Sequence, residues 1–326
     1  MRHTLYLLFL AFLMASCHSE QGIPPEELAR RDSAALHVAV MPTADCLPLF
    51  VADRTGLFDS VGVDVRLITY QAQLDIDTAL AKGHIELAYS DLIRAMMLQQ
   101  DTVGLYAVAA ADAHLSLVTA RRGRVRKLNQ LKERMVAIAR HSITDYWSDR
   151  LTDSAALQRD DIFRPQINSL RIRRGMILNN TMDAAFFPEP YTTQLRLQGN
   201  HVHFPTQGQS PQLGAWLIPT RVYTDATRTK QILKLWQAYN RAADRLNAHR
   251  TDRQRSEHTD SLARILQRTY EVPDSLCDTL LHLLPRFSRI AAPQRADVDA
   301  ALLWLKARKQ VRKGYNADTL FRELRP

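Results

Sequence analysis

The chain has 326 residues, 46% of them hydrophobic and 24% charged, which is typical of a globular protein with an extensive core. Basic residues outnumber acidic residues by 43 to 34, so the formal net charge is +9 and anionic partners are favoured in general. The densest basic run, "RRGRVRK" (121–127), holds no aromatic residue that could stack on a base, so we expect no nucleic-acid partner.

The N-terminal stretch "MRHTLYLLFLAFLMASC" has the order of an export signal. A short basic start precedes an apolar stretch of about ten residues, which is too short to span a bilayer comfortably. The small residues before Cys17 resemble the end of a bacterial lipobox, whose cysteine is lipidated. We therefore expect residues 1–16 to be a cleaved signal peptide and residues 17–35 a polar tether with its lipid anchor at Cys17. This places the protein on the periplasmic face of a bacterial membrane.

From Ala35 the sequence alternates between apolar runs and segments with helical spacing. The nearly continuous apolar run at 35–42 is typical of a strand that is covered on both faces. Further strands are predicted at 63–70, 84–90 and 103–111, and helices at 46–58, 74–83 and 91–100. Strands that alternate with short helices predict a parallel α/β sheet.

A second series of elements follows the first. Strands are predicted at 115–122, 134–139, 167–173, 183–187, 201–206 and 213–219, and helices at 142–157 and from Tyr191. The remainder of the chain is predicted to be helical, at 229–246, 257–270, 274–284 and 295–313. An apolar stripe on the first of these helices predicts a face packed in the core rather than a cofactor site: Ile232, Leu235, Trp236, Tyr239 and Ala243.

The two series of elements predict an α/β fold with two lobes. Lobe one combines residues 36–111 with residues 213–326, and lobe two consists of residues 116–208. The chain then crosses between the lobes twice, near 112–115 and near 207–212. Two crossings of this kind make a hinge.

Three segments carry a resemblance to a known family. They are "VAVMPTADCLPLFVADRTGLFDSVGVDVRLI" (38–68), "ALAKGHIELAYSD" (79–91) and "NNTMDAAFFPEPY" (179–191). In this order they resemble the extracytoplasmic solute-binding proteins of nitrate/taurine-type ABC importers, a superfamily that includes binders of thiamine-pyrimidine precursors. The resemblance implies a two-lobed periplasmic-binding-protein-like fold of type II, with the helical C-terminal segment packed on lobe one. It also implies a small-molecule ligand between the lobes, an ABC permease in the inner membrane as partner, and no cofactor or catalysis.

The polar residues at the ends of the predicted strands are the candidate ligand contacts. Ligands of open α/β sheets lie at the carboxyl ends of the strands, where helix N-termini offer unpaired N–H groups. The residues at these places are Thr43, Asp45, Cys46, Ser90, Asp91, Asp112, Arg140, His141, Ser142, Ile143 and Glu189. Several have a purely structural alternative, because Asp45 and Asp91 are also good helix caps, and Ser142 with Asp145 resembles a capping box.

Glu189 is held between Pro188 and Pro190 directly after an apolar strand. The prolines restrict the backbone, so a carboxylate there can accept hydrogen bonds from a ligand with little loss of entropy. The alternative is an ion pair with a nearby arginine that stabilises the turn. The ligand-binding interpretation favours a nitrogen-bearing ligand over a simple oxyanion.

The remaining cysteines, Cys46 and Cys277, have no motif around them, and their pairing stays open, with two free thiols favoured. No spacing of cysteine and histidine predicts a metal site. The sequence therefore favours a lipid-anchored binding protein that captures a small polar, nitrogen-containing molecule for an ABC importer. Two alternatives remain: an enzyme of the same fold, like the chorismate dehydratases or pyrimidine synthases, and a sensory or scaffold lipoprotein without a transport role.

Overall fold

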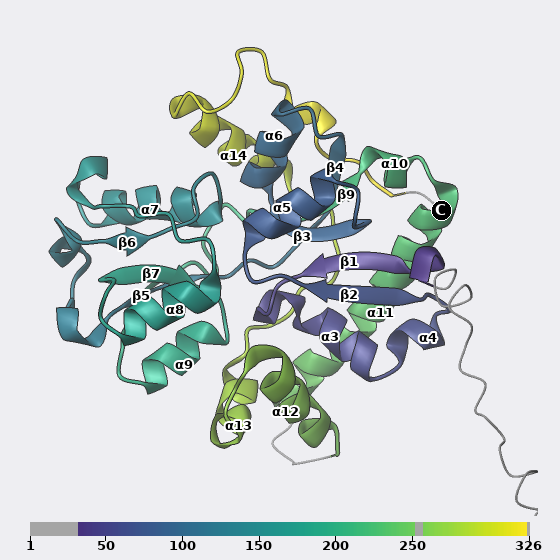
Figure 1. Cartoon of the computed structure of the whole chain (residues 1–326), viewed down its shortest axis with the longest axis horizontal. Helices are drawn as coiled ribbons and strands as arrows, with labels where there is room; N and C mark the ends of the chain where they lie inside the picture. The colour runs from purple at the N-terminus through teal and green to yellow at the C-terminus, as the bar shows by residue number, and fades with distance from the viewer. Residues whose placement is uncertain (1–31, 252–256, 325–326) are drawn as a thin grey trace, which may run out of the picture. The chain divides into compact units, whose positions relative to one another are not determined.

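Strand β3 (Leu87–Asp91) lies at the centre of a five-stranded sheet in the computed structural model, which describes residues 32–251 and 257–324. Its neighbours are β1 (Leu36–Val40) and β9 (Gly214–Pro219) (Figure 1). The edge strands are β2 (Val65–Thr69) and β4 (Leu105–Ala110). All residues of β3 and β9 are buried, which explains the continuous apolar sequence of β9, whereas β3 ends in the buried polar residues Ser90 and Asp91.

The five-stranded sheet is mixed, so the expectation of a parallel sheet was wrong in part. Strands β1, β2 and β3 run parallel, but β9 pairs antiparallel with both β3 and β4. The register places Gly214, the first residue of β9, opposite Asp91, the last residue of β3. The chain thus re-enters the sheet at the carboxyl end of β3, and β9 must run in the opposite direction.

Helices cover both faces of this sheet. They are η1 (Ala44–Cys46), α3 (Leu47–Arg54), α4 (Leu57–Ser60), α5 (Gln73–Ala81), α6 (Leu92–Gln100), α10 (Thr220–Tyr223) and α11 (Ala226–Thr251). The helix predicted at 46–58 is broken because Gly56 adopts a left-handed φ of 65°. The apolar stripe of α11 is buried, and this helix packs against α3 and α4.

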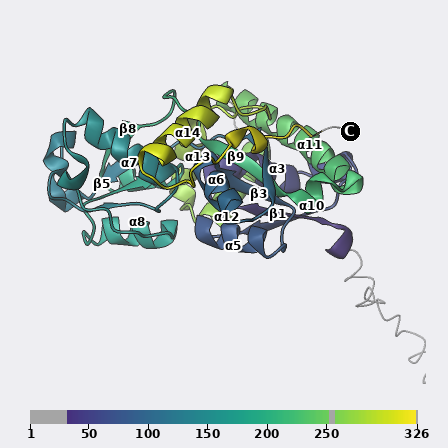
Figure 2. The same ribbon diagram turned by 90° about the horizontal axis from the view of Figure 1, so that it is seen from above.

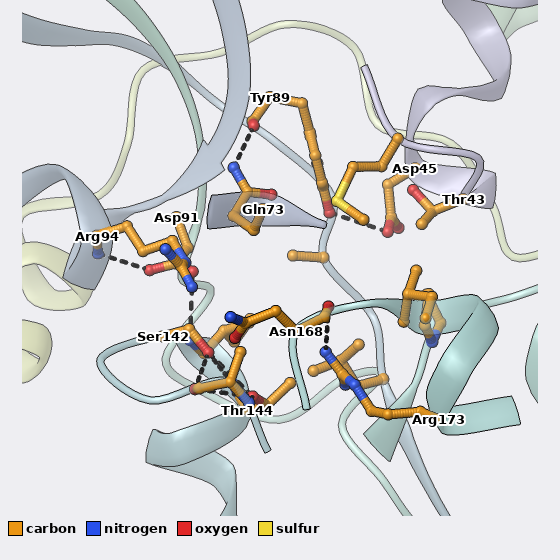
Figure 3. Close-up of a pocket in the computed structure, with 17 residues that line it drawn as sticks. Thr43, Asp45, Gln73, Tyr89, Asp91, Arg94, Ser142, Thr144, Asn168 and Arg173 are labelled. Atoms are coloured by element: carbon orange, nitrogen blue, oxygen red, sulfur yellow. Dashed lines mark hydrogen bonds between the residues drawn. The ribbon is translucent and has the colours of Figure 1, made fainter. Parts of the chain in front are cut away.

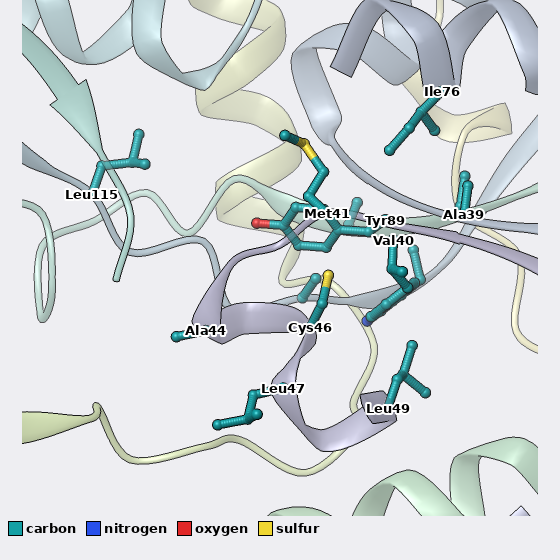
Figure 4. Packing of buried hydrophobic residues seen from close by; sticks show 14 of the residues in the cluster. Ala39, Val40, Met41, Ala44, Cys46, Leu47, Leu49, Ile76, Tyr89 and Leu115 are labelled. Carbon is teal, nitrogen blue, oxygen red and sulfur yellow. The ribbon is translucent and has the colours of Figure 1, made fainter. Parts of the chain in front are cut away.

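An aromatic cluster fills the core between β9 and α11. The ring centroid of Trp216 lies 5.6 Å from both Tyr89 and Trp236, and 6.3 Å from Tyr239. Figure 4 shows Tyr89 above Cys46 and the start of α3. Each such buried side chain contributes roughly 1.5–3 kcal/mol through removal of apolar surface from water. Tyr89 is therefore held rigidly by its ring, and its hydroxyl is bonded to polar groups outside this cluster.

A second sheet has four strands in the order β6, β7, β5, β8. Their bounds are β5 (Ser116–Thr119), β6 (Val136–Ala137), β7 (Ala184–Phe187) and β8 (His201–Pro205). Strand β5 pairs antiparallel with β7 and β8, whereas β6 runs parallel to β7. The helices of this part are η2 (Arg121–Gly123), η3 (Leu128–Leu131), α7 (Ile143–Ser154), η4 (Arg159–Asp161), α8 (Leu170–Leu178) and α9 (Tyr191–Leu197).

The strand predicted at 167–173 is wrong, because α8 begins at Leu170. Ser169 caps this helix by accepting the backbone N–H of Ile172 at 3.4 Å. The buried residues of α8 are Leu170, Arg173 and Ile177, which recur at helical intervals. Leu170 is buried whereas Ile172 is 57% exposed, so these two residues do not share the buried face that a strand would give them.

The C-terminal segment is helical and packs on the five-stranded part, as expected. Its elements are α12 (Glu257–Tyr270), α13 (Asp274–Leu283), α14 (Arg295–Ala307) and η5 (Ala317–Thr319). Helix α12 packs against α3, and α14 packs against α6. The segment also extends to the four-stranded part, because α13 contacts α9 and the end of α14 reaches α7 (Figure 2).

Residues 1–35 and 36–326 form two separate units. The predicted signal peptide and Cys17 lie outside the described residues. Within the described ranges, none of the helices combines the length and apolar character needed to cross a membrane. Cys46 and Cys277 are buried and are not bonded to each other. The predicted lobe boundaries and the hinge stay predictions.

Candidate functional site

A small cavity of about 70 Å³ lies where the end of β3 meets the start of α7 (Figure 3). Both sheets and their helices contribute to its lining. The polar lining residues are Thr43, Asp45, Gln73, Tyr89, Asp91, Arg94, Ser142, Thr144, Asn168 and Arg173. Five of the predicted ligand contacts therefore meet at this cavity: Thr43, Asp45, Asp91, Ser142 and Ile143.

Asp45 lies at one end of the lining, bonded to Tyr89. The Tyr89 hydroxyl donates to Asp45 Oδ2 at 3.0 Å and lies 3.3 Å from the carbonyl oxygen of Asp112. Burial raises the pKa of Asp45 well above its usual value, and the nearby charge of Asp112 adds to this increase. A positively charged or N–H-donating group beside Asp45 would favour its ionised form.

The carboxylate of Asp91 connects the end of β3 to the start of α7. Its Oδ1 accepts the backbone N–H of Arg94 at 2.9 Å, which caps α6, and its Oδ2 accepts the backbone N–H of Ile143 at 3.2 Å, at the start of α7. Burial raises the pKa of Asp91 to about 6, although Arg94 acts in the opposite direction. Asp91 thus serves as a helix cap and also lines the cavity.

Ser142 caps α7 from within its own segment. Its Oγ accepts the backbone N–H of Thr144 at 3.1 Å. The capping-box resemblance is off by one residue, because Asp145 Oδ2 accepts the N–H of His141 rather than that of Ser142. The start of α7 is therefore stabilised by Ser142, by Asp145 and by Asp91 from the other sheet.

Arg173 is a buried cation without a carboxylate partner among the described residues. It is 4% exposed and donates to the carbonyl oxygens of Phe186 at 3.0 Å and Asn168 at 3.3 Å. Its Nε has no acceptor in the part of the chain that the structure describes. Burial, together with the nearby charge of Arg94, lowers the pKa of Arg173 to about 10. Arg94, in contrast, forms an ion pair with Asp77.

Six predicted contacts do not line this cavity. Cys46 and Ser90 are buried in the core, and the carboxylate of Asp112 accepts the N–H of Ser288 at 2.8 Å. Arg140 and His141 line two larger cavities, of about 540 and 560 Å³. Their role as ligand contacts stays a prediction, as does that of Cys46, Ser90, Asp112 and Glu189.

Glu189 has a structural partner that neither sequence interpretation anticipated. Its two carboxylate oxygens accept the backbone N–H and the hydroxyl of Thr193, each at 3.1 Å, at the start of α9. Its carbonyl oxygen accepts the N–H of Ala44 at 2.7 Å. Glu189 also lines a separate cavity of about 70 Å³ with Asp45 and His114. The carboxylate of Glu189, between Pro188 and Pro190, thus stabilises the start of α9.

Residues 43–252, well over half of the chain, match the family model described as NMT1/THI5 like. The chain belongs to this family. No curated protein matches its sequence.

Solved structures show the fold. The alkanesulfonate-binding protein from Xanthomonas axonopodis pv. citri bound to MOPS is similar with a TM-score of 0.75 and 17% identity, over 89% of this chain and 98% of that one. The periplasmic nitrate-binding protein from Synechocystis PCC 6803 is similar with a TM-score of 0.62 and 14% identity, over 74% and 68%. The desulfurization enzyme DSZB is similar with a TM-score of 0.60 and 11% identity, over 89% and 96%. The NMT1/THI5-like chain thus has the two-lobed periplasmic-binding-protein fold.

Sequence reasoning missed six polar lining residues of this NMT1/THI5-like protein: Gln73, Tyr89, Arg94, Thr144, Asn168 and Arg173. Asn168 and Arg173 fell within the segment that was interpreted as a strand. The signal for them was Ser169 at a helix start, followed by buried positions at intervals of three and four. Within residues 32–251 and 257–324, no three histidine, cysteine or acidic side chains are grouped so that they could hold a metal ion.

Proposed function

We propose that the chain is an extracytoplasmic solute-binding protein that captures a small polar, nitrogen-containing molecule in the cavity lined by Asp45, Asp91 and Arg173. One observation carries the proposal. Thr43, Arg94 and Arg173 line this cavity, and each has a buried polar side-chain atom without a partner among the described residues. Burying such atoms without a partner is costly, and a bound solute would supply the missing hydrogen bonds.

The groups around the cavity favour a solute with two kinds of polar end. Asp45 and Asp91 would accept hydrogen bonds from N–H groups of the solute, and Arg173 would donate to an oxygen acceptor. The volume of about 70 Å³ is small, because one water needs roughly 10–15 Å³ by this measure. The solute therefore has only a few non-hydrogen atoms in contact with the cavity, unless the lobes open.

The relatives support a binding role, since two of the similar structures are described as binding proteins for alkanesulfonate and nitrate. We infer that the captured solute is delivered to an ABC permease in the inner membrane. We further infer that residues 1–16 are removed and that a lipid on Cys17 anchors the chain through the tether at 17–35. The intact mass of membrane-extracted protein should show a diacylglyceryl cysteine at the N-terminus, and a Cys17→Ser form that stays membrane-bound after cleavage would contradict the anchor.

A thermal-shift screen of amines, vitamin precursors, sulfonates and oxyanions tests the binding role directly. A true solute at a hundredfold excess over its Kd stabilises the folded state by about 2.7 kcal/mol, which raises the Tm by several degrees. Arg173→Met should weaken this binding by at least about tenfold, because a buried donor to the solute is lost. The matched control is Arg150→Met, which removes an exposed arginine of α7 that pairs with Asp153.

Further measurements with the screened solutes distinguish binding from the alternative functions. If the lobes close on the solute, small-angle scattering should give a smaller radius of gyration at saturation, and an unchanged profile would count against closure. The likeness to a desulfurization enzyme makes catalysis the second candidate. Recovery of the solute unchanged after incubation supports binding, whereas its conversion would show an enzyme. Failure of every solute to bind would favour a sensory or scaffold role.

A further inference from the structure

The N-terminus of α7 borders the cavity, and its first backbone N–H groups already have acceptors. The N–H of Ile143 is bonded to Asp91 Oδ2 at 3.2 Å, and the N–H of Thr144 to Ser142 Oγ at 3.1 Å. The next two N–H groups, those of Asp145 and Tyr146, are bonded to the carbonyl oxygen of Ser142 at 3.0 and 3.1 Å. No donor of this first turn is left for an outside ligand.

One of these acceptors comes from a distant part of the chain. Asp91 lies 52 positions before Ile143 and belongs to the other sheet, whereas Ser142 is the residue directly before the helix. A carboxylate at a helix N-terminus makes the same interactions as a bound oxyanion, namely N–H hydrogen bonds and attraction to the helix dipole. Asp91 is therefore an internal anion at the place where a solute oxyanion would bind (Figure 3).

We propose that Asp91 determines the specificity of the cavity by occupying the N-terminus of α7, so that the solute presents an N–H donor to this end and not an oxyanion. This inference rests on the proposed function and narrows its solute class. An ammonium, amidine or amide group would meet the remaining lone pairs of Asp91 and, farther along the lining, Asp45. A sulfonate or nitrate would instead meet a like charge.

The surroundings of Asp91 make its displacement unfavourable. Its side chain is buried, with 4% of the residue exposed, so water cannot readily replace the N–H groups of Arg94 and Ile143. The guanidinium of Arg94 is already paired with Asp77. An incoming oxyanion would have to break the bond to Ile143 and then lie beside an uncompensated carboxylate. The Nε of Arg173, which has no acceptor among the described residues, remains available to an oxygen acceptor of the same solute.

The test uses the mature chain with Asp91→Ser, and methanesulfonate and nitrate as probes. Serine is itself a good N-cap for α6 but is too short to replace both carboxylate bonds, so the N–H of Ile143 becomes free. Asp91→Asn is the second variant, since it retains the shape and removes the charge. The matched control is Asp183→Ser, which removes a carboxylate that accepts the N–H of Met135 at 2.9 Å, outside the cavity.

Calorimetric titration of the four proteins gives the result, with circular dichroism to show that each is folded. We expect the unaltered chain and Asp183→Ser to bind neither probe measurably, and at least one Asp91 variant to bind methanesulfonate at least about tenfold more tightly. Equal affinity of the unaltered chain and the variants would overturn the inference and leave the binding function intact. Folded variants that gain no affinity would overturn it as well. Absence of binding by every solute of the thermal-shift screen, amines included, would overturn the proposed function itself.

Discussion

Arg308 donates from its guanidinium to the carboxylate of Asp145 at 2.7 Å, which joins the end of α14 to the start of α7. Asp145 is 1% exposed, and Arg308 also lies 3.4 Å from Asp149. The indole N–H of Trp304 donates to Asp149 at 2.9 Å, and the guanidinium of Arg308 lies 4.6 Å from the Trp304 ring centroid. The C-terminal segment thus braces the helix whose N-terminus borders the cavity.

Replacement of Arg308 by methionine should destabilise the fold, because Asp145 is left as a buried carboxylate without its cation. Breaking a buried pair in this way costs about 3 kcal/mol in unfolding free energy. The control is Arg289→Met, whose pair with Asp244 is exposed and contributes less than about 1 kcal/mol. Urea denaturation of both variants measures the difference, and equal midpoints would show that the brace is not energetically important.

Gly214 should not tolerate even a methyl group. A Cβ at this position would collide with the backbone carbonyl of Ala111 and would lie 2.8 Å from Cβ of Ala113. Gly214→Ala should therefore lower the unfolding free energy by about 2–3 kcal/mol. Gly175→Ala is the control, because its Cβ would meet nothing within 4 Å inside α8, and it should stabilise the protein by about 0.5–1 kcal/mol. Opposite shifts of the two thermal midpoints are expected.

Stability should depend on pH through Asp91. Burial raises the pKa of Asp91 from its usual 3.8 to about 6, with Asp77 adding to the increase, Arg94 opposing it, and Tyr89 also close by. The folded state then binds more protons than the unfolded state between these values. The stabilising contribution is fully present below about pH 4 and is lost as the pH rises through about 6.

Asp91→Asn measures this contribution, because it removes the titrating carboxyl group and retains the shape of the side chain. The unfolding free energy of the unaltered chain minus that of the variant should fall by about 3 kcal/mol between pH 4 and pH 7. Denaturant titrations at four or five pH values measure it. A difference that stays constant would show that the pKa of Asp91 is the same in the folded and unfolded states, and a difference that grows with pH would show that folding lowers this pKa.

Glu189→Gln separates the helix-capping role from the ligand-binding role. An amide can replace only one of the two acceptors that hold Thr193, so we expect a loss of about 1 kcal/mol in unfolding free energy and unchanged solute affinity. Glu271→Gln, in which an exposed side chain pairs with Arg171, is the control and should change stability by less than about 0.5 kcal/mol. A weakened affinity with an unchanged midpoint would support the ligand contact that the sequence predicted.

Much of the fold could be predicted because the apolar pattern of each helix or strand lies within one short segment of the sequence. The apolar runs that became β1 and β7, and the stripe of α11, each report the period and burial of one element. The placement of Asp45, Asp91 and Ser142 at the cavity followed from their positions after strands, since strand ends gather at one edge of a sheet. The family resemblance was confirmed by the NMT1/THI5-like match.

The tertiary structure alone decided which partner each polar group has. Nothing near Asp91 in the sequence indicates that it bonds to Ile143, 52 positions later. The buried and partly unpartnered state of Arg173 depends on the surfaces that close over α8. Short-range patterns indicate which side of an element is buried. Whether a hydrogen bond forms, in contrast, depends on the donor–acceptor distance to within a few tenths of an ångström. That precision arises only when segments far apart in the chain pack together.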